Sequence, residues 1–209
     1  MLVKMFFVRH GETEGNLTNR FYDSPEIPLT ELGRKQARDA GKALREQFLR
    51  GINEIYCSPW VRAKETCTLA LEAIGMQARE IKFDERLRER SFSGLVGKKI
   101  NWDGTLDDCP DAISSKDYQD IWTYGHPKSK QFGIETLPEL KKRAVSFIND
   151  VSGKGVSSSR YQKSIVVFSH GGFGRMLEVV CCDYWPKGGQ FDKVRFLENG
   201  EVALWTYRT

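Results

Sequence analysis

The sequence is poor in the residue patterns that build disulfide frameworks and metal centres. Its five cysteines are an odd number, Cys181 and Cys182 are adjacent, and none forms a C-x-x-C pair. Free thiols in a reducing cytoplasm are therefore expected, rather than disulfides or a zinc knuckle. None of the three histidines, at positions 10, 126 and 170, has neighbours at metal-ligand spacing. The sequence thus predicts neither a bound metal nor another cofactor.

The sequence also lacks long apolar runs and an excess of one charge. No stretch approaches the ~18 apolar residues that a membrane-spanning helix needs, and the N-terminal MLVKMFFVRHGE has no A-x-A-like cleavage site. The 32 basic and 28 acidic residues give a net charge of only +4, too balanced to suggest a nucleic-acid partner but compatible with a local anion pocket. We therefore expect a cytoplasmic protein without membrane or nucleic-acid partners. The sequence carries no sign of its oligomeric state.

What the sequence does contain is an alternation of strand-like and helix-like segments. A length of 209 residues with 40% hydrophobic and 29% charged residues suits one domain spanning 1–209. Apolar runs predict strands at 3–9, 54–57, 80–84 and 164–168, and helical periodicity predicts helices within 30–51, 58–75 and 137–151. This alternation predicts an α/β protein, a single-domain three-layer α/β/α sandwich with a mostly parallel sheet.

Two parts of the chain break this alternation. Segment 98–134 contains scattered Gly, Asp, Pro and Trp, and we expect an irregular insertion with short helices that covers the active site. The stretch KVRFLENGEVALWTY, at 193–207, predicts a hairpin or strand pair that turns at Asn199-Gly200.

Polar side chains follow the predicted strands at the point where each strand ends. Arg9 and His10 end the first strand, Arg62 lies one turn into the helix after the second, Glu89 follows the third, and His170 ends the fourth. Ligands of parallel α/β sheets bind beyond the carboxyl ends of the strands, so these side chains should meet at one edge. Each alone has an ordinary explanation, such as a cap or a surface ion pair. Together, two arginines and two histidines near helix N-termini indicate an anion site, most commonly for phosphate.

Five motifs in a fixed order carry a family resemblance. They are RHGETEGN (9–16), PLTELGRKQA (28–37), CSPWVRAKET (57–66), LRERSFSGLVG (87–97) and VVFSHGG (166–172). With these motifs the chain resembles the histidine phosphatase superfamily, also called phosphoglycerate mutase-like. R-H-G alone is a weak signal, whereas five ordered motifs that span nearly the whole chain apart from the insertion are specific.

The resemblance implies a role for each motif residue. His10 matches the nucleophile that takes the phosphoryl group as a phosphohistidine. Glu89 matches the general acid that protonates the leaving oxygen and then activates water. The groups that would hold the phosphoryl oxygens are Arg9, Asn16, Arg62, His170 and the Gly171 N–H.

Ser58 does not match a nucleophile. Ser58-Pro59 precedes a predicted helix, where a serine caps and a proline takes the first helical position. SHGGFG also departs from the G-x-S-x-G of serine hydrolases. We therefore expect Ser58 to be a helix cap.

Within the family, the resemblance leaves a phosphatase and a mutase open. Mutases of this kind hold a substrate carboxylate with paired arginines in the insertion, but residues 98–134 contain lysines and no arginine, and a lysine cannot form a bidentate fork. Phe92 and Ser93 also replace the Tyr and the first Gly of the mutase loop Tyr-Gly-x-Leu-x-Gly. The sequence therefore favours a phosphatase.

The expected activity is that of a histidine acid phosphatase-type phosphomonoesterase acting on a small phosphorylated metabolite. Tyr22 and Ser24 are expected to shape the pocket of its leaving group. The alternatives are phosphoglycerate mutase-type phosphoryl transfer and a non-catalytic phosphate-binding module.

Overall fold

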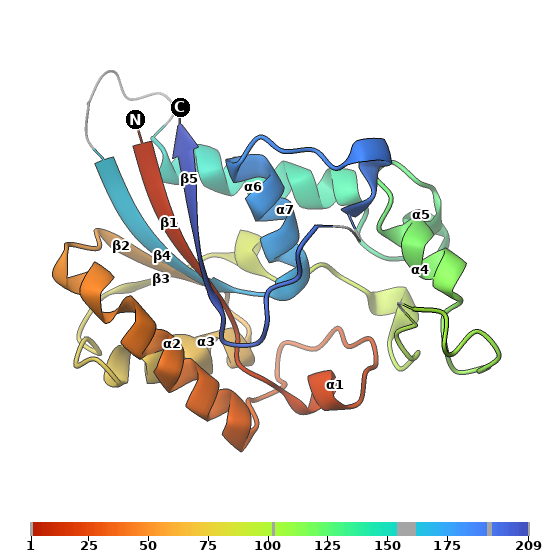
Figure 1. Ribbon diagram of the computed structural model, residues 1–209, viewed down its shortest axis with the longest axis horizontal. Coiled ribbons are helices and arrows are strands. Elements are labelled where there is room, and N and C mark those ends of the chain that lie inside the picture. The colour runs from red at the N-terminus through yellow and green to blue at the C-terminus, as the bar shows by residue number, and fades with distance from the viewer. Residues whose placement is uncertain (1, 102, 154–161, 192–193, 209) are drawn as a thin grey trace.

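A computed structural model describes residues 2–101, 103–153, 162–191 and 194–208. Its five-stranded sheet has the order β3-β2-β4-β1-β5 (Figure 1). The strands are β1 (Leu2–Arg9), β2 (Glu54–Cys57), β3 (Ile81–Phe83), β4 (Gln162–Ser169) and β5 (Val202–Arg208). The first four run parallel, and β5 pairs antiparallel with β1. The prediction of a mostly parallel sheet is confirmed.

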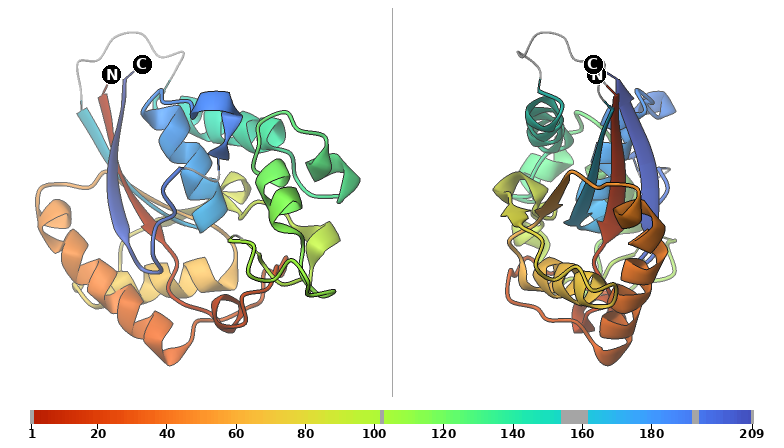
Figure 2. Two further views of the ribbon diagram at one scale, coloured as in Figure 1. Left: turned by 45° about the vertical axis from the view of Figure 1, so that its right-hand side comes forward. Right: turned by 90° about the vertical axis from the view of Figure 1, so that its left-hand side faces the viewer.

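Helices cover both faces of the sheet (Figures 1 and 2). The helices of one face are α2 (Glu31–Leu49) and α3 (Val61–Glu72), and those of the other are α6 (Leu137–Val151) and α7 (Gly171–Cys181). Side chains of a strand alternate between faces, so Phe6 and Val8 of β1 join the apolar cluster under α2 and α3, whereas Phe7 joins the cluster under α6 and α7. The predicted three-layer α/β/α sandwich is confirmed.

The remaining helical segments are short. They are α1 (Glu14–Leu17), α4 (Ser115–Ile121), α5 (Lys128–Gln131), and the 3-10 turns η1 (Glu85–Leu87), η2 (Ser93–Leu95) and η3 (Lys187–Gly189). Both α4 and α5 belong to segment 98–134 and lie to one side of the sheet (Figure 1).

Side-chain caps begin α2, α4 and α6, but a predicted cap at α3 is absent. Thr30 Oγ1 accepts a hydrogen bond from Gly33 N (3.0 Å) at the start of α2, as predicted. The predicted cap at Ser58 is wrong, because α3 begins only at Val61. Ser58 Oγ instead lies 2.8 Å from Nε2 of the fully buried His170. A buried imidazole needs a hydrogen-bond partner, and this serine supplies it.

The hairpin predicted at 193–207 is wrong in its first arm. The second arm is β5, but residues 194–201 form no strand. They bind the end of β1 instead: Gly200 N donates to Arg9 O (3.1 Å) and His10 O (3.2 Å), and Arg9 N donates to Glu201 O (3.2 Å). Strand β1 thus takes the place beside β5 that the first arm of the hairpin would have held.

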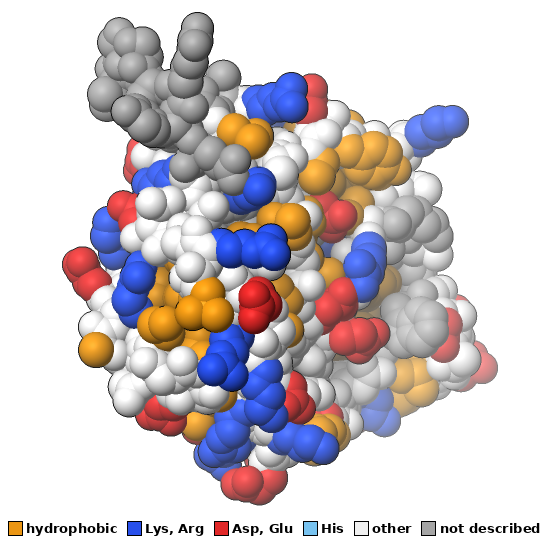
Figure 3. All heavy atoms as spheres, turned by 60° about the vertical axis from the view of Figure 1, so that its left-hand side comes forward, with side chains coloured by type: hydrophobic (Ala, Val, Ile, Leu, Met, Phe, Trp, Pro, Cys, Tyr) orange, Lys and Arg blue, Asp and Glu red, His pale blue; other side chains and the backbone are white. Residues whose placement is uncertain are grey.

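The surface carries mixed charge. On the face seen in Figure 3, Lys and Arg side chains lie among Asp and Glu side chains, with scattered hydrophobic groups between them. Among the residues that the structure describes, there is no helix with the length and apolar character to cross a membrane.

Candidate active site

The parallel pairing of β1 and β4 brings two motifs together. Arg9 stands opposite Ser169 in register, and His10 N donates to Ser169 O (3.0 Å). The residues that follow these strands therefore meet, and the ring centroids of His10 and His170 lie 5.2 Å apart. The carboxyl edge of the sheet gathers side chains as the topology rule predicts.

A cavity of about 750 Å³ opens at this edge. Six of the nine predicted site residues line it: Arg9, His10, Asn16, Tyr22, Arg62 and Glu89. The other three do not line it. His170 is fully buried beside His10, Gly171 is buried under the Phe196 ring, and Ser24 presents its carbonyl oxygen to Arg62 Nη1 (2.9 Å).

His10 is held as a neutral imidazole with a defined tautomer. Its Nδ1 lies 2.7 Å from the Gly11 carbonyl oxygen, which can only accept, so Nδ1 carries the proton. Its Nε2 accepts from Arg62 Nε (3.3 Å). Burial, followed by the charges of Arg62 and Arg9, lowers the pKa of His10 well below 6.5. At neutral pH the side chain therefore keeps an unprotonated nitrogen in the cavity.

Two guanidinium groups are fixed beside this imidazole. Arg62 lies 4.5 Å from the centre of the Trp60 ring, and Arg9 lies 4.3 Å from that of Phe196 while Nη1 of Arg9 donates to Leu197 O. Burial lowers the pKa of each arginine to about 10, which leaves both charged at neutral pH. Two partly desolvated cations in one cavity favour an anionic ligand.

The Glu89 carboxylate occupies the start of α7. Its oxygens accept from Gly172 N (3.0 Å), Phe173 N (2.9 Å) and Arg90 N (2.8 Å). A helix N-terminus stabilises a negative charge. The resemblance assigns this helix start to the phosphate through the Gly171 N–H, whereas the next two amides bind the protein's own carboxylate.

The loop that carries Glu89 is tied to the rest of the fold by two arginines. Arg90, with no exposed surface, donates to Glu135 O (2.8 Å) and to Ile121 O (2.8 Å) at the end of α4. Arg143 donates to Glu89 O (3.1 Å) and to both carboxylate oxygens of Glu135 (2.7 Å each). The position of the carboxylate is thus coupled to α6 and to segment 98–134.

The two ring nitrogens of His170 differ in their hydrogen bonding. Ser58 Oγ is hydrogen-bonded to Nε2, whereas Nδ1 has no hydrogen-bond partner within the described part of the chain. Burial, followed by the charge of Arg62, lowers the pKa of His170 well below 6.5. The ring is therefore neutral at pH 7.

Sequence reasoning missed most of the other residues that line the cavity, among them Arg20, Arg175, Phe196, Glu198 and Asn199. Arg175 stands four positions after Gly171, so helical spacing places it on the face of α7 that begins at the site. That spacing is a signal that could have identified it. Phe196 and Glu198 belong to the segment that the hairpin prediction treats as a strand.

Asn199 acts as a support and not only as a turn residue. Its Nδ2 donates to His10 O (3.1 Å) and to Asn16 Oδ1 (3.3 Å), and Asn16 Oδ1 also accepts from Thr13 N (3.0 Å). With its oxygen occupied, Asn16 keeps its amide nitrogen to donate to a ligand.

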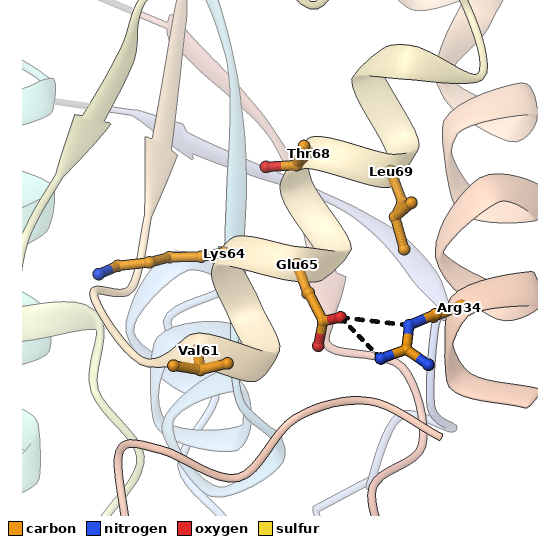
Figure 4. A pocket seen from close by; sticks show the side chains of 6 residues that line it. All are labelled: Arg34, Val61, Lys64, Glu65, Thr68 and Leu69. Atoms are coloured by element: carbon orange, nitrogen blue, oxygen red, sulfur yellow. Dashed lines mark hydrogen bonds and ion pairs between the residues drawn. The ribbon is translucent and has the colours of Figure 1, made fainter. Parts of the chain in front are cut away.

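A second, smaller hollow of about 290 Å³ lies between α2 and α3 (Figure 4). Its polar groups bind one another: Arg34 Nε and Nη2 donate to Glu65 Oε1 (3.2 and 3.1 Å), and Glu65 Oε2 accepts from Leu29 N (2.8 Å). The cavity at the sheet edge is lined by His10 and by the buried cations Arg9 and Arg62. It is therefore the candidate active site.

The described residues include no group of three or more His, Cys, Asp or Glu side chains that could hold a metal ion. The five cysteines are free, as the sequence predicts.

The two buried histidines predict a loss of stability in acid. In the unfolded chain they take up protons near pH 6.5, whereas both pKa values are far lower in the folded state. Below about pH 6.5 the unfolded state binds more protons, so the free energy of unfolding falls as the pH falls. Urea unfolding at about pH 7.5 and about pH 5.5 should show this loss, and it should be smaller in a His10→Gln, His170→Gln double variant. Equal losses in the two proteins would contradict the assignment.

Comparisons with known proteins show a family match over most of the chain. The model of the histidine phosphatase superfamily (branch 1) matches residues 5–184. A 2,3-bisphosphoglycerate-dependent phosphoglycerate mutase of Streptococcus pneumoniae is 40% identical over 97 residues, which are 46% of this chain. The match spans 42% of the length of that curated relative.

Solved structures share the fold over almost the whole chain. A mycobacterial glucosyl-3-phosphoglycerate phosphatase in complex with VO3 has a TM-score of 0.72 at 22% identity, covering 96% of this chain and 90% of that one. A phosphoglycerate mutase of Bacillus anthracis has a TM-score of 0.73 at 21% identity, covering 99% of this chain and 88% of that one. At these identities the similarity establishes the fold.

Proposed function

The chain belongs to the histidine phosphatase superfamily, and from that premise we propose that it hydrolyses a phosphomonoester through a phosphohistidine on His10. The observation that carries the proposal is the unprotonated Nε2 of His10, which lines the cavity 3.3 Å from Arg62 Nε. A neutral imidazole next to fixed cations is a nucleophile facing groups that attract its anionic target.

In the first step, Arg62 Nε turns from His10 Nε2 to a phosphoryl oxygen, and the freed lone pair of Nε2 forms a bond to phosphorus as the bond to the leaving oxygen breaks. Glu89 gives its proton to that oxygen, so the alcohol departs neutral. The second step returns this proton to Glu89, so the same side chain serves as the acid in each turnover. Arg9 and Arg62 neutralise the phosphoryl oxygens as charge spreads over them.

In the second step, water attacks the phosphorus of the phosphohistidine. Glu89, now a carboxylate, takes a proton from that water, and the P–N bond breaks to return neutral His10 and inorganic phosphate. The Nδ1–H···O bond to Gly11 keeps the imidazole in the required tautomer through both steps.

Two side chains supply neutral hydrogen bonds to the phosphoryl group in this proposal. Asn16 donates through the amide nitrogen that its own contacts leave available. When the Ser58 hydroxyl donates to Nε2 of His170, Nδ1 carries the proton, and this unpartnered N–H is the donor for a phosphoryl oxygen.

The composition of segment 98–134 supports a phosphatase over a mutase in this proposal. No lysine from the described part of segment 98–134 lines the cavity, and this segment has no arginine. The structure therefore offers no counterpart there of the paired arginines that would hold the carboxylate of a phosphoglycerate for return of the phosphoryl group.

The proposal predicts that p-nitrophenyl phosphate is hydrolysed without added metal, at a rate that EDTA does not change. The chemistry described above uses only side chains of this chain, which is the reason for the expected resistance to chelation. A phosphoglycerate mutase assay with 3-phosphoglycerate and 2,3-bisphosphoglycerate belongs beside it. Isomerisation faster than hydrolysis would replace the phosphatase assignment with the mutase alternative.

A further inference from the structure

Glu89 belongs to a loop that has almost no regular secondary structure of its own. Residues 86–91, which form the acid loop, begin within the 3-10 turn η1 and are otherwise neither helix nor strand. A proton donor must lie within hydrogen-bond reach of the leaving oxygen, and a misplacement of about 1 Å can cost roughly 100-fold in rate. A loop of this kind needs support from other elements to carry a general acid.

Arg143 of α6 supplies such support to the backbone of the acid loop. Its Nη1 donates to Arg86 O (2.6 Å) and Arg88 O (2.7 Å), and its Nη2 donates to Glu89 O (3.1 Å). Three carbonyl oxygens within four consecutive residues are thus bound by one side chain. Because a guanidinium is planar and rigid, these bonds define the orientation of the loop as well as its distance from α6.

Glu135 holds both this guanidinium and the far end of the acid loop. Its carboxylate oxygens accept from Arg143 Nε and Nη2 (2.7 Å each), and Oε2 also accepts from Ser91 N (3.2 Å). The side chains of Arg143 and Glu135 are only 14% and 17% exposed, so salt screens their ion pair weakly. Arg143 and Glu135 therefore form a clamp that holds the loop on both sides of Glu89.

The clamp also contacts the residue that binds the Glu89 carboxylate. The Arg143 guanidinium lies 4.8 Å from the centre of the Phe173 ring, and Phe173 N donates to Glu89 Oε1 (2.9 Å). Arg143 itself does not line the cavity, and the bonds to the acid loop and Glu135 use all five of its N–H donors. Arg143 therefore has no donor left for a phosphoryl group, and its route to the reaction passes through Glu89.

We propose that Arg143 is a positioning residue for proton transfer, whose clamp on the acid loop sets where Glu89 meets the leaving oxygen. Attack on phosphorus does not depend on this clamp, since His10 follows β1 and Arg62 belongs to α3. The inference rests on the proposed function, because it concerns the step in which Glu89 gives its proton.

The test compares p-nitrophenyl phosphate with 4-nitrobenzyl phosphate as substrates of an Arg143→Met variant. The two esters carry similar rings, but the nitrophenolate leaves without a proton, whereas the benzyl alcohol needs one. Met is similar to Arg in length and keeps apolar contact with the Phe173 ring, but it removes every donor. The value of kcat/KM, which reports the steps up to phosphorylation of His10, should fall by roughly 10- to 100-fold for 4-nitrobenzyl phosphate and by less than about threefold for p-nitrophenyl phosphate.

The matched control is Arg34→Met, which removes a comparable ion pair far from Glu89. Arg34 donates to Glu65 Oε1 through Nε (3.2 Å) and Nη2 (3.1 Å) between α2 and α3. This variant should keep the ratio of the two kcat/KM values. An equal loss for both esters in Arg143→Met, or the same change of the ratio in both variants, would overturn the inference and leave the proposed phosphatase standing. An unmodified protein that hydrolyses neither ester would overturn the phosphatase and this inference with it.

Two further variants distinguish position from fold and from charge. In a Glu89→Gln background, Arg143→Met should lower kcat/KM for 4-nitrobenzyl phosphate by no more than about twofold, since the acid that it positions is already absent. Arg143→Lys keeps the charge without the planar fork and should show most of the loss. An undiminished loss in the Gln background, or full activity of Arg143→Lys, would contradict the positioning role.

Glu135→Gln tests the same clamp if Arg143→Met does not fold. The amide keeps the shape of the side chain and an oxygen for Ser91 N, but it removes the charge that holds the guanidinium. The ratio of the two kcat/KM values should change in the same direction, by roughly three- to tenfold. An unchanged ratio in the folded Glu135→Gln protein would overturn the inference.

Discussion

Replacement of His10 by Ala is expected to lower the turnover of p-nitrophenyl phosphate by roughly 10⁴-fold or more, because no second nucleophile can take over the attack. His170 cannot substitute, since its Nε2 accepts from the Ser58 hydroxyl and its Nδ1 carries the proton in the proposed mechanism. The fold should persist. The replaced ring is buried, but its only hydrogen bond to the backbone joins it to Gly11, the next residue in the chain. Loss of this local bond should not disrupt distant parts of the fold. Steady-state kinetics with a thermal melt of each protein checks both parts.

The matched control for this variant is His126→Ala. His126 lies in segment 98–134, does not line the cavity, and is 3.8 Å from Asp120. It should keep nearly full activity. Substantial turnover in a folded His10→Ala protein would remove His10 from the role of nucleophile and would favour direct attack by water.

Replacement of Glu89 by Gln is expected to slow hydrolysis of an alkyl phosphate by roughly 10²- to 10⁴-fold, the usual contribution of a general acid or base. The amide keeps the shape of the side chain but can neither give nor take the proton. With p-nitrophenyl phosphate the substitution should slow the second step of the reaction and leave the first step fast. The nitrophenolate leaves without a proton, so phosphorylation of His10 stays fast and only hydrolysis of the intermediate slows.

This difference between the two steps should appear as a burst of p-nitrophenolate release. The variant should release about one p-nitrophenolate per active site rapidly and then turn over slowly, whereas the control Glu72→Gln, exposed at the end of α3, should behave like the unmodified protein. Equal slowing of both substrates without a burst would show that Glu89 is not the proton donor to the leaving group.

The sequence was sufficient for the parts of this account that depend on single strands and the residues directly after them. Arg9, His10 and Glu89 are found in the cavity because parallel strands end at a common edge, which is a rule of topology and not of side-chain packing. The same reasoning gave the strands, the three layers and the α2 cap at Thr30.

The errors arose where a residue's partner is distant in the chain. Ser58 has a local reason to cap α3 but a stronger partner in His170, 112 residues away. Asn199-Gly200 has the chemistry of a turn, yet its bonds to His10 and Asn16 depend on β5 pairing with β1. Helix starts likewise attract any anion, and only the packed structure shows that Glu89 takes the amides of α7.

The measurement that tests the central claim most directly is the location of the phosphoryl group in the Glu89→Gln variant after it has reacted with p-nitrophenyl phosphate. The sample is quenched in base and mapped by mass spectrometry, since phosphohistidine survives base and is lost in acid. The account predicts one phosphoryl group, on His10. A phosphoryl group on another residue, or an unmodified protein after a measured burst, would contradict it.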